Sequence, residues 1–262
     1  MRIVLMLLCC MGLAGQTVKA APHLNYQVIR TEAHDPSSFT QGLAVAGNQL
    51  IEGTGLYGRS RLTVRDRSTG KLLHSTSLLP EEFGEGVAVV GEHIVQLTWM
   101  NAVGYVYDRR LKRVGTFPLS TEGWGLAYDG KRLVLSDGSA KLRFIDPVKF
   151  GVIGSVDVMD GGQRVDRLNE LEAVDGLIFA NVWRSDKIAI IEPQSGQIQA
   201  WLNLAALRMQ VAFIAGDLGP DSVLNGIAQL PENGHLLVTG KCWPMMFEIA
   251  VDLQSLRPAE SH

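Results

Sequence analysis

The feature that most constrains the fold is a short signature that recurs five times along the chain. It consists of a polar or aromatic residue, then Gly or Glu, then an aliphatic residue that begins a strand-like run. Its starts are separated by 44, 39, 45 and 56 residues, and they are Gln41, Glu85, Trp124, Asn169 and Asn225. A repeat of roughly 40–45 residues is typical of a β-propeller blade, so the spacing predicts a propeller.

Each repeat contains four short strand-like runs separated by turns. In the second repeat these runs cover residues 86–90, 94–99, 102–108 and 114–119. Five repeats of four strands predict an all-β fold, a five-bladed β-propeller. A β-sandwich would not repeat the same first-strand signature, and a β-solenoid would have a shorter repeat.

The two ends of the chain complement each other. The fifth repeat contains only three strand-like runs, and a spare run lies at residues 25–30 before the first signature. An N-terminal strand that completes the last blade would close the ring and leave no open edge. The longest step contains an insertion at residues 205–222, where Gly216 and Pro220 interrupt regular structure. We expect this insertion to be a surface loop, with a lid or an interface as alternatives.

The first twenty residues have the pattern of a signal peptide. Arg2 precedes an apolar run over residues 3–14, and small residues suited to cleavage end at Ala20. The run is too short to span a bilayer, and no later segment has eighteen consecutive apolar residues. We therefore predict a signal peptide at 1–20, one propeller domain at 21–262, and export to the periplasm or medium. Only Cys242 remains after cleavage, so no internal disulfide is expected.

Charge and motif content exclude several functions. The net charge of −3 argues against nucleic acid or an anionic membrane as a partner. We expect the protein to be a monomer. The six histidines are scattered without metal-ligand spacing, so no metal site is expected from them. The sequence also lacks a Gly-x-Ser-x-Gly elbow and a phosphate-binding loop.

Propeller geometry indicates where a site would form. The first strand of each blade lines the central channel, and the second strand runs antiparallel to the first. The start of the first strand and the end of the second strand therefore lie at the same rim of the channel. The strand-one starts are the five signature residues, and the predicted strand-two ends are Thr54, Trp99, Asp137, Trp183 and Lys241. This rim would thus bring together three tryptophans, a carboxylate, a lysine and several carboxamides. Such a set predicts a binding site for a small molecule or a peptide end.

Eight ordered motifs resemble those of the plant and bacterial glutamine cyclotransferases. They span nearly all of the chain after residue 20, at family-like spacing, and are Phe39-Thr-Gln-Gly-Leu43, Gly53-Thr-Gly-Leu-Tyr-Gly-Arg-Ser60, Phe83-Gly-Glu-Gly-Val87, Glu122-Gly-Trp-Gly-Leu126, Leu168-Asn-Glu-Leu-Glu172, Asn181-Val-Trp-Arg-Ser-Asp186, Leu224-Asn-Gly-Ile-Ala228 and Thr239-Gly-Lys-Cys-Trp-Pro244. The resemblance implies a five-bladed propeller that converts N-terminal glutamine, free or on a peptide or protein, into pyroglutamate and ammonia. It also implies catalysis without zinc, unlike that of the animal-type glutaminyl cyclases.

The resemblance further implies roles for individual residues. Glu85 would be the general acid/base, while Asn169, Lys241 and Gln41 would bind the amide and α-amine of the substrate. The pocket walls would be Phe39, Trp99, Trp124 and Trp183. Asn225 joins the expected substrate-binding set as the fifth signature start.

These roles suit the chemistry. Cyclisation is an attack of the α-amine on the γ-carboxamide carbon of the same residue, so folding the side chain back is a large part of catalysis. One carboxylate, Glu85, can take the amine proton and deliver it to the leaving ammonia, and burial among indoles would raise its pKa toward neutrality. Lys241 or the Asn169 amide can stabilise the tetrahedral oxygen, and the indoles would limit water.

Two other functions fit the same rim. One is a propeller lactonase or sugar-acid hydrolase, in which Glu85, Asn169 and Asn225 would bind Ca²⁺. The other is a binding propeller without catalysis. We expect no cofactor for catalysis, and the sequence leaves open a structural divalent cation.

Overall fold

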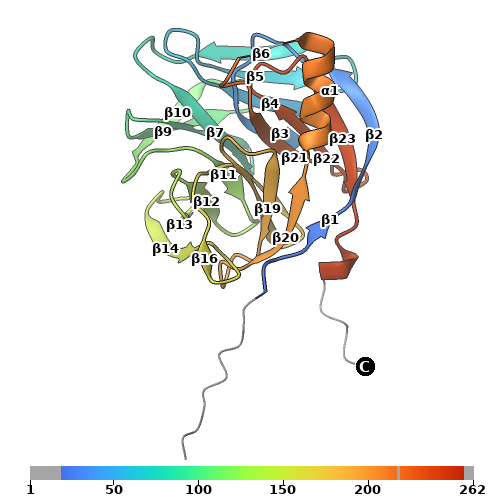
Figure 1. Cartoon of the computed structure of the whole chain (residues 1–262). Helices are drawn as coiled ribbons and strands as arrows, with labels where there is room; N and C mark the ends of the chain where they lie inside the picture. The colour runs from blue at the N-terminus through green and yellow to red at the C-terminus, as the bar shows by residue number, and fades with distance from the viewer. Residues whose placement is uncertain (1–18, 217–218, 257–262) are drawn as a thin grey trace, which may run out of the picture.

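Most of the described part of the chain consists of β-strands arranged around a common axis (Figure 1). The computed structural model describes residues 19–216 and 219–256. Five sheets each contain four antiparallel strands, and each of these four-stranded units is one blade. The predicted all-β, five-bladed propeller is therefore confirmed.

The first three blades are formed by consecutive strands. Blade 1 consists of β3 (Thr40–Ala46), β4 (Gln49–Thr54), β5 (Arg61–Asp66) and β6 (Leu72–Ser77). Blade 2 consists of β7 (Gly84–Val90), β8 (His93–Thr98), β9 (Val103–Asp108) and β10 (Arg113–Pro118). Blade 3 consists of β11 (Leu126–Tyr128), β12 (Leu133–Ser136), β13 (Lys141–Ile145) and β14 (Val152–Asp157).

The last two blades include the chain ends and the irregular elements. Blade 4 consists of β17 (Leu168–Val174), β18 (Leu177–Val182), β19 (Lys187–Ile191) and β20 (Ile198–Asn203). Blade 5 consists of β21 (Leu224–Gln229), β22 (Leu236–Gly240), β23 (Met245–Val251) and β2 (Tyr26–Ala33). The remaining elements are the hairpin strands β15 (Met159–Asp160) and β16 (Gln163–Arg164), the 3-10 helix η1 (Gln254–Leu256) and α1 (Ala205–Ala215).

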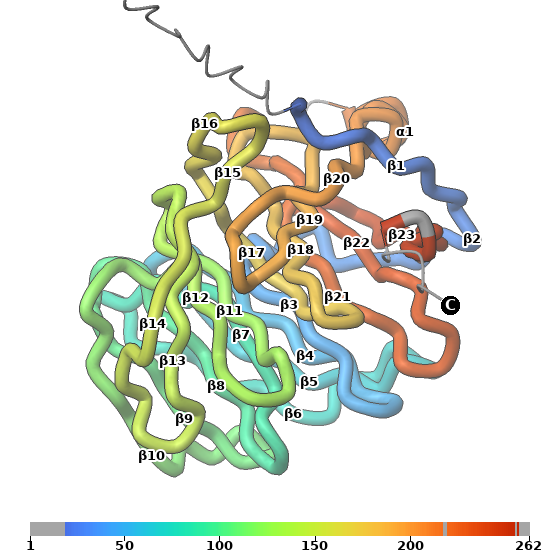
Figure 2. Tube along the Cα trace, turned by 90° about the horizontal axis from the view of Figure 1, so that it is seen from below, coloured from blue at the N-terminus to red at the C-terminus, as the bar shows by residue number. Residues whose placement is uncertain are grey.

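An N-terminal strand closes the ring, as the sequence predicted. Strand β2 pairs antiparallel with β23, with Tyr26 opposite Val251 and Ala33 opposite Met245. The preceding strand β1 (His23–Leu24) pairs in parallel with β20, so blade 4 carries a fifth strand that the sequence analysis did not anticipate. Figure 2 shows the N-terminal segment running beside β20 before it reaches blade 5.

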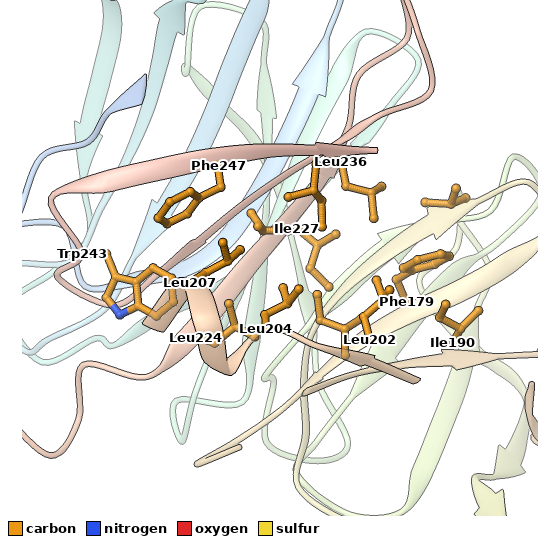
Figure 3. Packing of buried hydrophobic residues seen from close by; sticks show 14 of the residues in the cluster. Phe179, Ile190, Leu202, Leu204, Leu207, Leu224, Ile227, Leu236, Trp243 and Phe247 are labelled. Carbon is orange, nitrogen blue, oxygen red and sulfur yellow. The ribbon is translucent and has the colours of Figure 1, made fainter. Parts of the chain in front are cut away.

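The hydrophobic core lies between neighbouring blades. Figure 3 shows the cluster between blades 4 and 5, where Phe179 and Leu202 face Ile227 and Phe247. Similar clusters join the other neighbours, but the one between blades 5 and 1 is the smallest, with five buried members including Leu43 and Met246. The middle strands are buried on both faces, which fits their largely apolar sequences.

In blades 1, 2 and 3 the inner strands approach one another too closely for a side chain at the second signature position. A Cβ on Gly42 would lie 2.4 Å from the Val87 nitrogen, and a Cβ on Gly125 would lie 1.9 Å from the Asn169 carbonyl oxygen. Glu170 occupies the corresponding position in blade 4 and is fully buried. Its two carboxyl oxygens accept hydrogen bonds from the backbone of the inner strands of blades 1 and 5, at 3.1 and 2.9 Å.

The insertion at 205–222 contains a helix instead of the expected loop. Helix α1 stands at the side of the propeller near blade 5 (Figure 1) and buries Leu207 and Val211 in the cluster between blades 4 and 5. Trp243 packs in the same cluster and donates from Nε1 to the Ser222 carbonyl oxygen at 3.1 Å. Favourable helix formers such as Ala and Leu precede the breaker Gly216, so the helix ends where the sequence placed a break.

Candidate active site

A pocket of about 290 Å³ opens at the rim where the signature residues begin their strands. All five blades, or the loops that precede them, contribute to its wall. The lining residues are Phe39, Gln41, Leu56, Phe83, Glu85, Trp99, Trp124, Asn169, Trp183, Asp221 and Lys241. The rim predicted from strand starts and strand ends is therefore where the cavity lies.

Irregular pairing between the first two strands of a blade directs several of these side chains into the pocket. The register between the first and second strands shifts at the signature in blades 1, 2, 4 and 5, for example between Gly84 and Val87. A β-bulge bends its strand and redirects the side chains next to it. Gln41, Glu85 and Asn169 lie within these shifts, and all three side chains line the pocket.

Glu85 is a buried acid in the pocket wall. Its side chain is buried, and Oε1 accepts a hydrogen bond from Gln41 Nε2 at 2.9 Å. Among the described residues, Oε2 has no hydrogen-bond partner. Burial raises the pKa of this carboxyl well above 4.5, the charge of Lys241 opposes that rise, and the charge of Glu122 adds to it. A buried carboxyl with a raised pKa in a pocket is a candidate for general acid/base catalysis.

Lys241 brings the cation of the pocket. It follows β22, its backbone nitrogen donates to the Val223 carbonyl oxygen at 2.9 Å, and its side chain is buried. Nζ lies 4.8 Å from the centre of the Phe39 ring, within the range of a cation–π contact. Burial lowers the pKa of this amine, whereas the carboxylates of Glu85 and Asp221 raise it.

Carboxamides complete the polar part of the wall and form the layer behind it. Asn169 is buried and its side chain lines the pocket. Asn225 lies behind Gln41 and away from the pocket surface, because Nδ2 donates to the Thr40 carbonyl oxygen at 2.9 Å and to Gln41 Oε1 at 3.3 Å. The structure therefore places Asn225 as a support for Gln41, which in turn binds Glu85.

Aromatic rings form the rest of the wall in two groups. In the first group Phe83 makes edge-to-face contacts with Phe39 and Trp99, at centroid distances of 6.1 and 5.6 Å. In the second, Trp124 and Trp183 meet edge to face at 5.6 Å. These are favourable arrangements for aromatic pairs, and they fix the shape of the apolar part of the wall.

Three lining residues, Leu56, Phe83 and Asp221, were not predicted from the sequence. Phe83 stands two residues before Glu85, as Phe39 stands two before Gln41, so this shared spacing was an available signal. Asp221 belongs to the insertion at 205–222 and carried no comparable signal. Three predicted rim residues, Thr54, Asp137 and Asn225, do not line the pocket.

Within residues 19–216 and 219–256, no group of three or more His, Cys, Asp or Glu side chains is arranged to hold a metal ion. In the same ranges, no helix is long and apolar enough to cross a membrane.

Fold and pocket together define a class of protein. It is a five-bladed propeller with a buried acid, a buried lysine and carboxamides in an aromatic pocket at one rim. Such an arrangement suits proton transfer on a small polar group held among aromatic rings.

Comparisons with known proteins agree on a family. The family model described as glutamine cyclotransferase matches residues 1–251. A glutaminyl-peptide cyclotransferase of Arabidopsis thaliana is 39% identical over 248 residues, covering 93% of this chain and 77% of that relative. The crystal structure of Myxococcus xanthus glutaminyl cyclase superposes with a TM-score of 0.82 at 34% identity, covering 88% of this chain and 98% of that one. The chain belongs to the glutamine cyclotransferase family.

A more distant structure supports the fold alone. The WD40 β-propeller domain of Doa1 is 12% identical, has a TM-score of 0.50, and covers 82% of this chain and 64% of its own. This likeness concerns the propeller architecture only.

Proposed function

We propose that this protein is a glutaminyl-peptide cyclotransferase that converts N-terminal glutamine, free or on peptides and proteins, into pyroglutamate. Family membership and the likeness to a glutaminyl cyclase support this activity. The observation that carries it in the site is Glu85, a buried acid with one oxygen on Gln41 and the other without a protein partner among the described residues.

The reaction transfers protons at two nitrogens. The α-amine of the substrate attacks its own γ-carboxamide carbon, which forms a C–N bond and places negative charge on the carboxamide oxygen. Glu85 accepts the proton that the attacking amine releases and then donates it to the departing nitrogen. The original C–N bond breaks, ammonia leaves, and the ring carbonyl re-forms, so Glu85 returns to its starting state.

The other polar residues have distinct tasks in this proposal. The Lys241 ammonium and the Asn169 amide are hydrogen-bond donors at the pocket wall, so they can stabilise the charged oxygen of the tetrahedral intermediate. The chain of hydrogen bonds from Asn225 through Gln41 fixes the Glu85 carboxyl before substrate binds. A fixed base removes the need to reorganise the site during the reaction.

The aromatic wall favours cyclisation over hydrolysis. A folded glutamine side chain packs its methylene groups against indole and phenyl rings, and the rings displace water that would otherwise attack the carboxamide. The four predicted wall residues, Phe39, Trp99, Trp124 and Trp183, all line the pocket together with Phe83.

Mass spectrometry of a peptide that begins with glutamine tests the activity. The wild-type protein is expected to remove the mass of one ammonia molecule, whereas Glu85→Gln is expected to be slower by roughly a hundredfold to ten-thousandfold. Glu92→Gln is the matched control because that side chain is 89% exposed on blade 2. Equal rates in wild type and Glu85→Gln would remove Glu85 from the mechanism.

Neither alternative function is favoured by the family to which the chain belongs. A calcium-dependent lactonase would use Glu85, Asn169 and Asn225 as ligands, but the Asn225 amide is engaged behind the wall with Thr40 and Gln41. A purely binding propeller gives no account of the buried acid and lysine side by side with an aromatic pocket.

The cellular setting is also part of the proposal. We propose catalysis without a metal cofactor, a monomeric protein, and no nucleic acid or membrane partner, supported by the sequence pattern and charge. We also propose export through a signal peptide at 1–20, of which residues 1–18 lie outside the described residues. N-terminal sequencing of protein recovered outside the cytoplasm tests the cleavage, which we expect after Ala20.

A further inference from the structure

A single carboxylate connects the two aromatic groups of the pocket wall. Glu122 Oε2 accepts a hydrogen bond from Trp99 Nε1 at 2.8 Å and another from Trp124 Nε1 at 2.9 Å. Trp99 follows β8 in blade 2 and packs against Phe83, whereas Trp124 precedes β11 in blade 3 and packs against Trp183. The sequence analysis assigned no role to Glu122 beyond its place in a motif.

The loop that carries Glu122 is held at both sides. The nitrogen of Gly123 donates to the Thr98 carbonyl oxygen at 3.2 Å, and the nitrogen of Trp124 donates to the Ser136 carbonyl oxygen at 3.0 Å. A Cβ on Gly123 would lie 2.8 Å from that Thr98 oxygen, so the loop runs directly against the end of β8. The backbone thus places the carboxylate between blades 2 and 3, where both indoles reach it.

We propose that Glu122 is a positioning residue for the reaction, because its carboxylate fixes the indoles of Trp99 and Trp124 as one continuous wall against the glutamine side chain. This proposal rests on the proposed function. Hydrogen bonds to an ionised acceptor are stronger than neutral ones, so one carboxylate can hold both rings. Without these hydrogen bonds, each indole ring could rotate about its two side-chain torsions. A ring that leaves its position in the wall would widen the pocket.

The charge of Glu122 has a second effect, on the general acid/base. The charged groups that act on Glu85 are Lys241, which favours its ionised form, and Glu122, which disfavours it. Gln41 faces the same carboxyl as an uncharged donor. Removing the negative charge of Glu122 therefore lowers the pKa of Glu85.

Two substitutions separate these effects. Glu122→Gln keeps an oxygen that can accept both indole hydrogen bonds but removes the charge. Glu122→Ala removes the acceptor as well. Glu92→Gln removes a charge from an exposed position elsewhere on blade 2 and serves as the control. Steady-state kinetics on a glutamine-initiated peptide are measured across pH, and acrylamide quenching of tryptophan fluorescence is measured without substrate.

For Glu122→Ala we expect KM to rise roughly tenfold, as for loss of an interaction worth about one charged hydrogen bond, with a smaller fall in kcat. Quenching should increase because the two indoles are released. For Glu122→Gln we expect KM within about twofold of wild type, while the limb of the pH profile that depends on Glu85 moves to lower pH. Circular dichroism confirms that each variant is folded.

The outcomes are separable. Unchanged quenching and unchanged KM in folded Glu122→Ala would overturn the positioning role, and so would an identical loss in Glu92→Gln. An unshifted pH limb in Glu122→Gln would overturn the effect on Glu85. Failure of wild-type protein to release ammonia would instead overturn the proposed function, whereas the quenching measurement still tests the contact with the indoles.

Discussion

The junction between blades 5 and 1 depends on a buried ion pair, and breaking it is the sharpest test of how the ring is closed. His34 Nε2 lies 2.9 Å from Glu52 Oε1, with the two side chains 3% and 5% exposed. His34 Nδ1 donates to the Trp243 carbonyl oxygen at 2.7 Å. This imidazole therefore joins the segment after β2, strand β4 of blade 1 and the segment after β22 of blade 5.

The expected loss of stability follows from burial. In His34→Ala, Glu52 stays buried and keeps only its hydroxyl donors, such as Thr40 at 2.7 Å. Removing one partner of a buried ion pair costs about 3–5 kcal/mol. For a domain of this size each kcal/mol lowers Tm by about 2–4 °C, so we expect a fall of roughly 6–20 °C. The small apolar cluster at this junction cannot replace the pair.

The dependence on pH gives a second signature. Burial disfavours the charged imidazole, but the hydrogen bond and charge of Glu52 outweigh it and raise the pKa of His34 above 6.5. Its stabilisation is therefore complete below about pH 6.5 and is lost as pH rises through the raised pKa. Burial likewise opposes ionisation of Glu52, but the hydrogen bond and charge of His34 outweigh this effect and lower the pKa of Glu52 below 4.5. The stabilisation that comes from ionised Glu52 is therefore lost only as pH falls through this lowered pKa.

Thermal and urea unfolding across pH measure both effects. Wild type should lose stability on the alkaline side of the His34 transition, and His34→Ala should lack that slope. His93→Ala, at the exposed start of β8, is the control. A loss below about 1 kcal/mol in His34→Ala, or an alkaline slope that persists in it, would refute the ion-pair account.

Three further predictions concern the axis and the chemistry. Gly125→Ala should lose activity and stability, because the added Cβ would lie 1.9 Å from the Asn169 carbonyl oxygen. Gly151→Ala is the control, because a Cβ there meets no atom within 4 Å, and it should behave as wild type in thermal melting and ammonia-release assays. Glu170→Gln should lower the free energy of unfolding, measured in urea, by about 1–3 kcal/mol, because one of the two backbone N–H donors would then face the NH₂ group of the new side chain. An unchanged free energy of unfolding would contradict this account. Activity should survive EDTA, and a loss restored by calcium would contradict a metal-free Glu85 mechanism.

The fold could be predicted from the sequence because each blade repeats the same local pattern. The signature fixed the number of blades, and the missing fourth strand of the last repeat indicated that residues 25–30 complete it. Strand β1 and helix α1 were not anticipated. Two residues in β1 carry no periodicity, and the breakers around Gly216 suggested a loop although the preceding eleven residues form a helix.

The site was predictable only as far as blade geometry determines it. Strand starts and ends gave Gln41, Glu85 and Lys241, since the backbone course alone brings them to one rim. Whether a side chain reaches the cavity depends on bulges and loops. Asn225 shares the signature position but lies behind Gln41, whereas Asp221 enters the pocket from an insertion that has no counterpart in other blades.

Glu170 has a structural role beside the pocket. It follows Asn169 on β17, and its carboxyl bridges the inner strands of blades 1 and 5 beneath the pocket. A separate hollow is lined by Glu172 and by the far ends of the inner strands of blades 1 to 3. Changes at residues that line the pocket, such as Trp99 and Trp124, should alter substrate binding, whereas changes at Glu170 should act on stability.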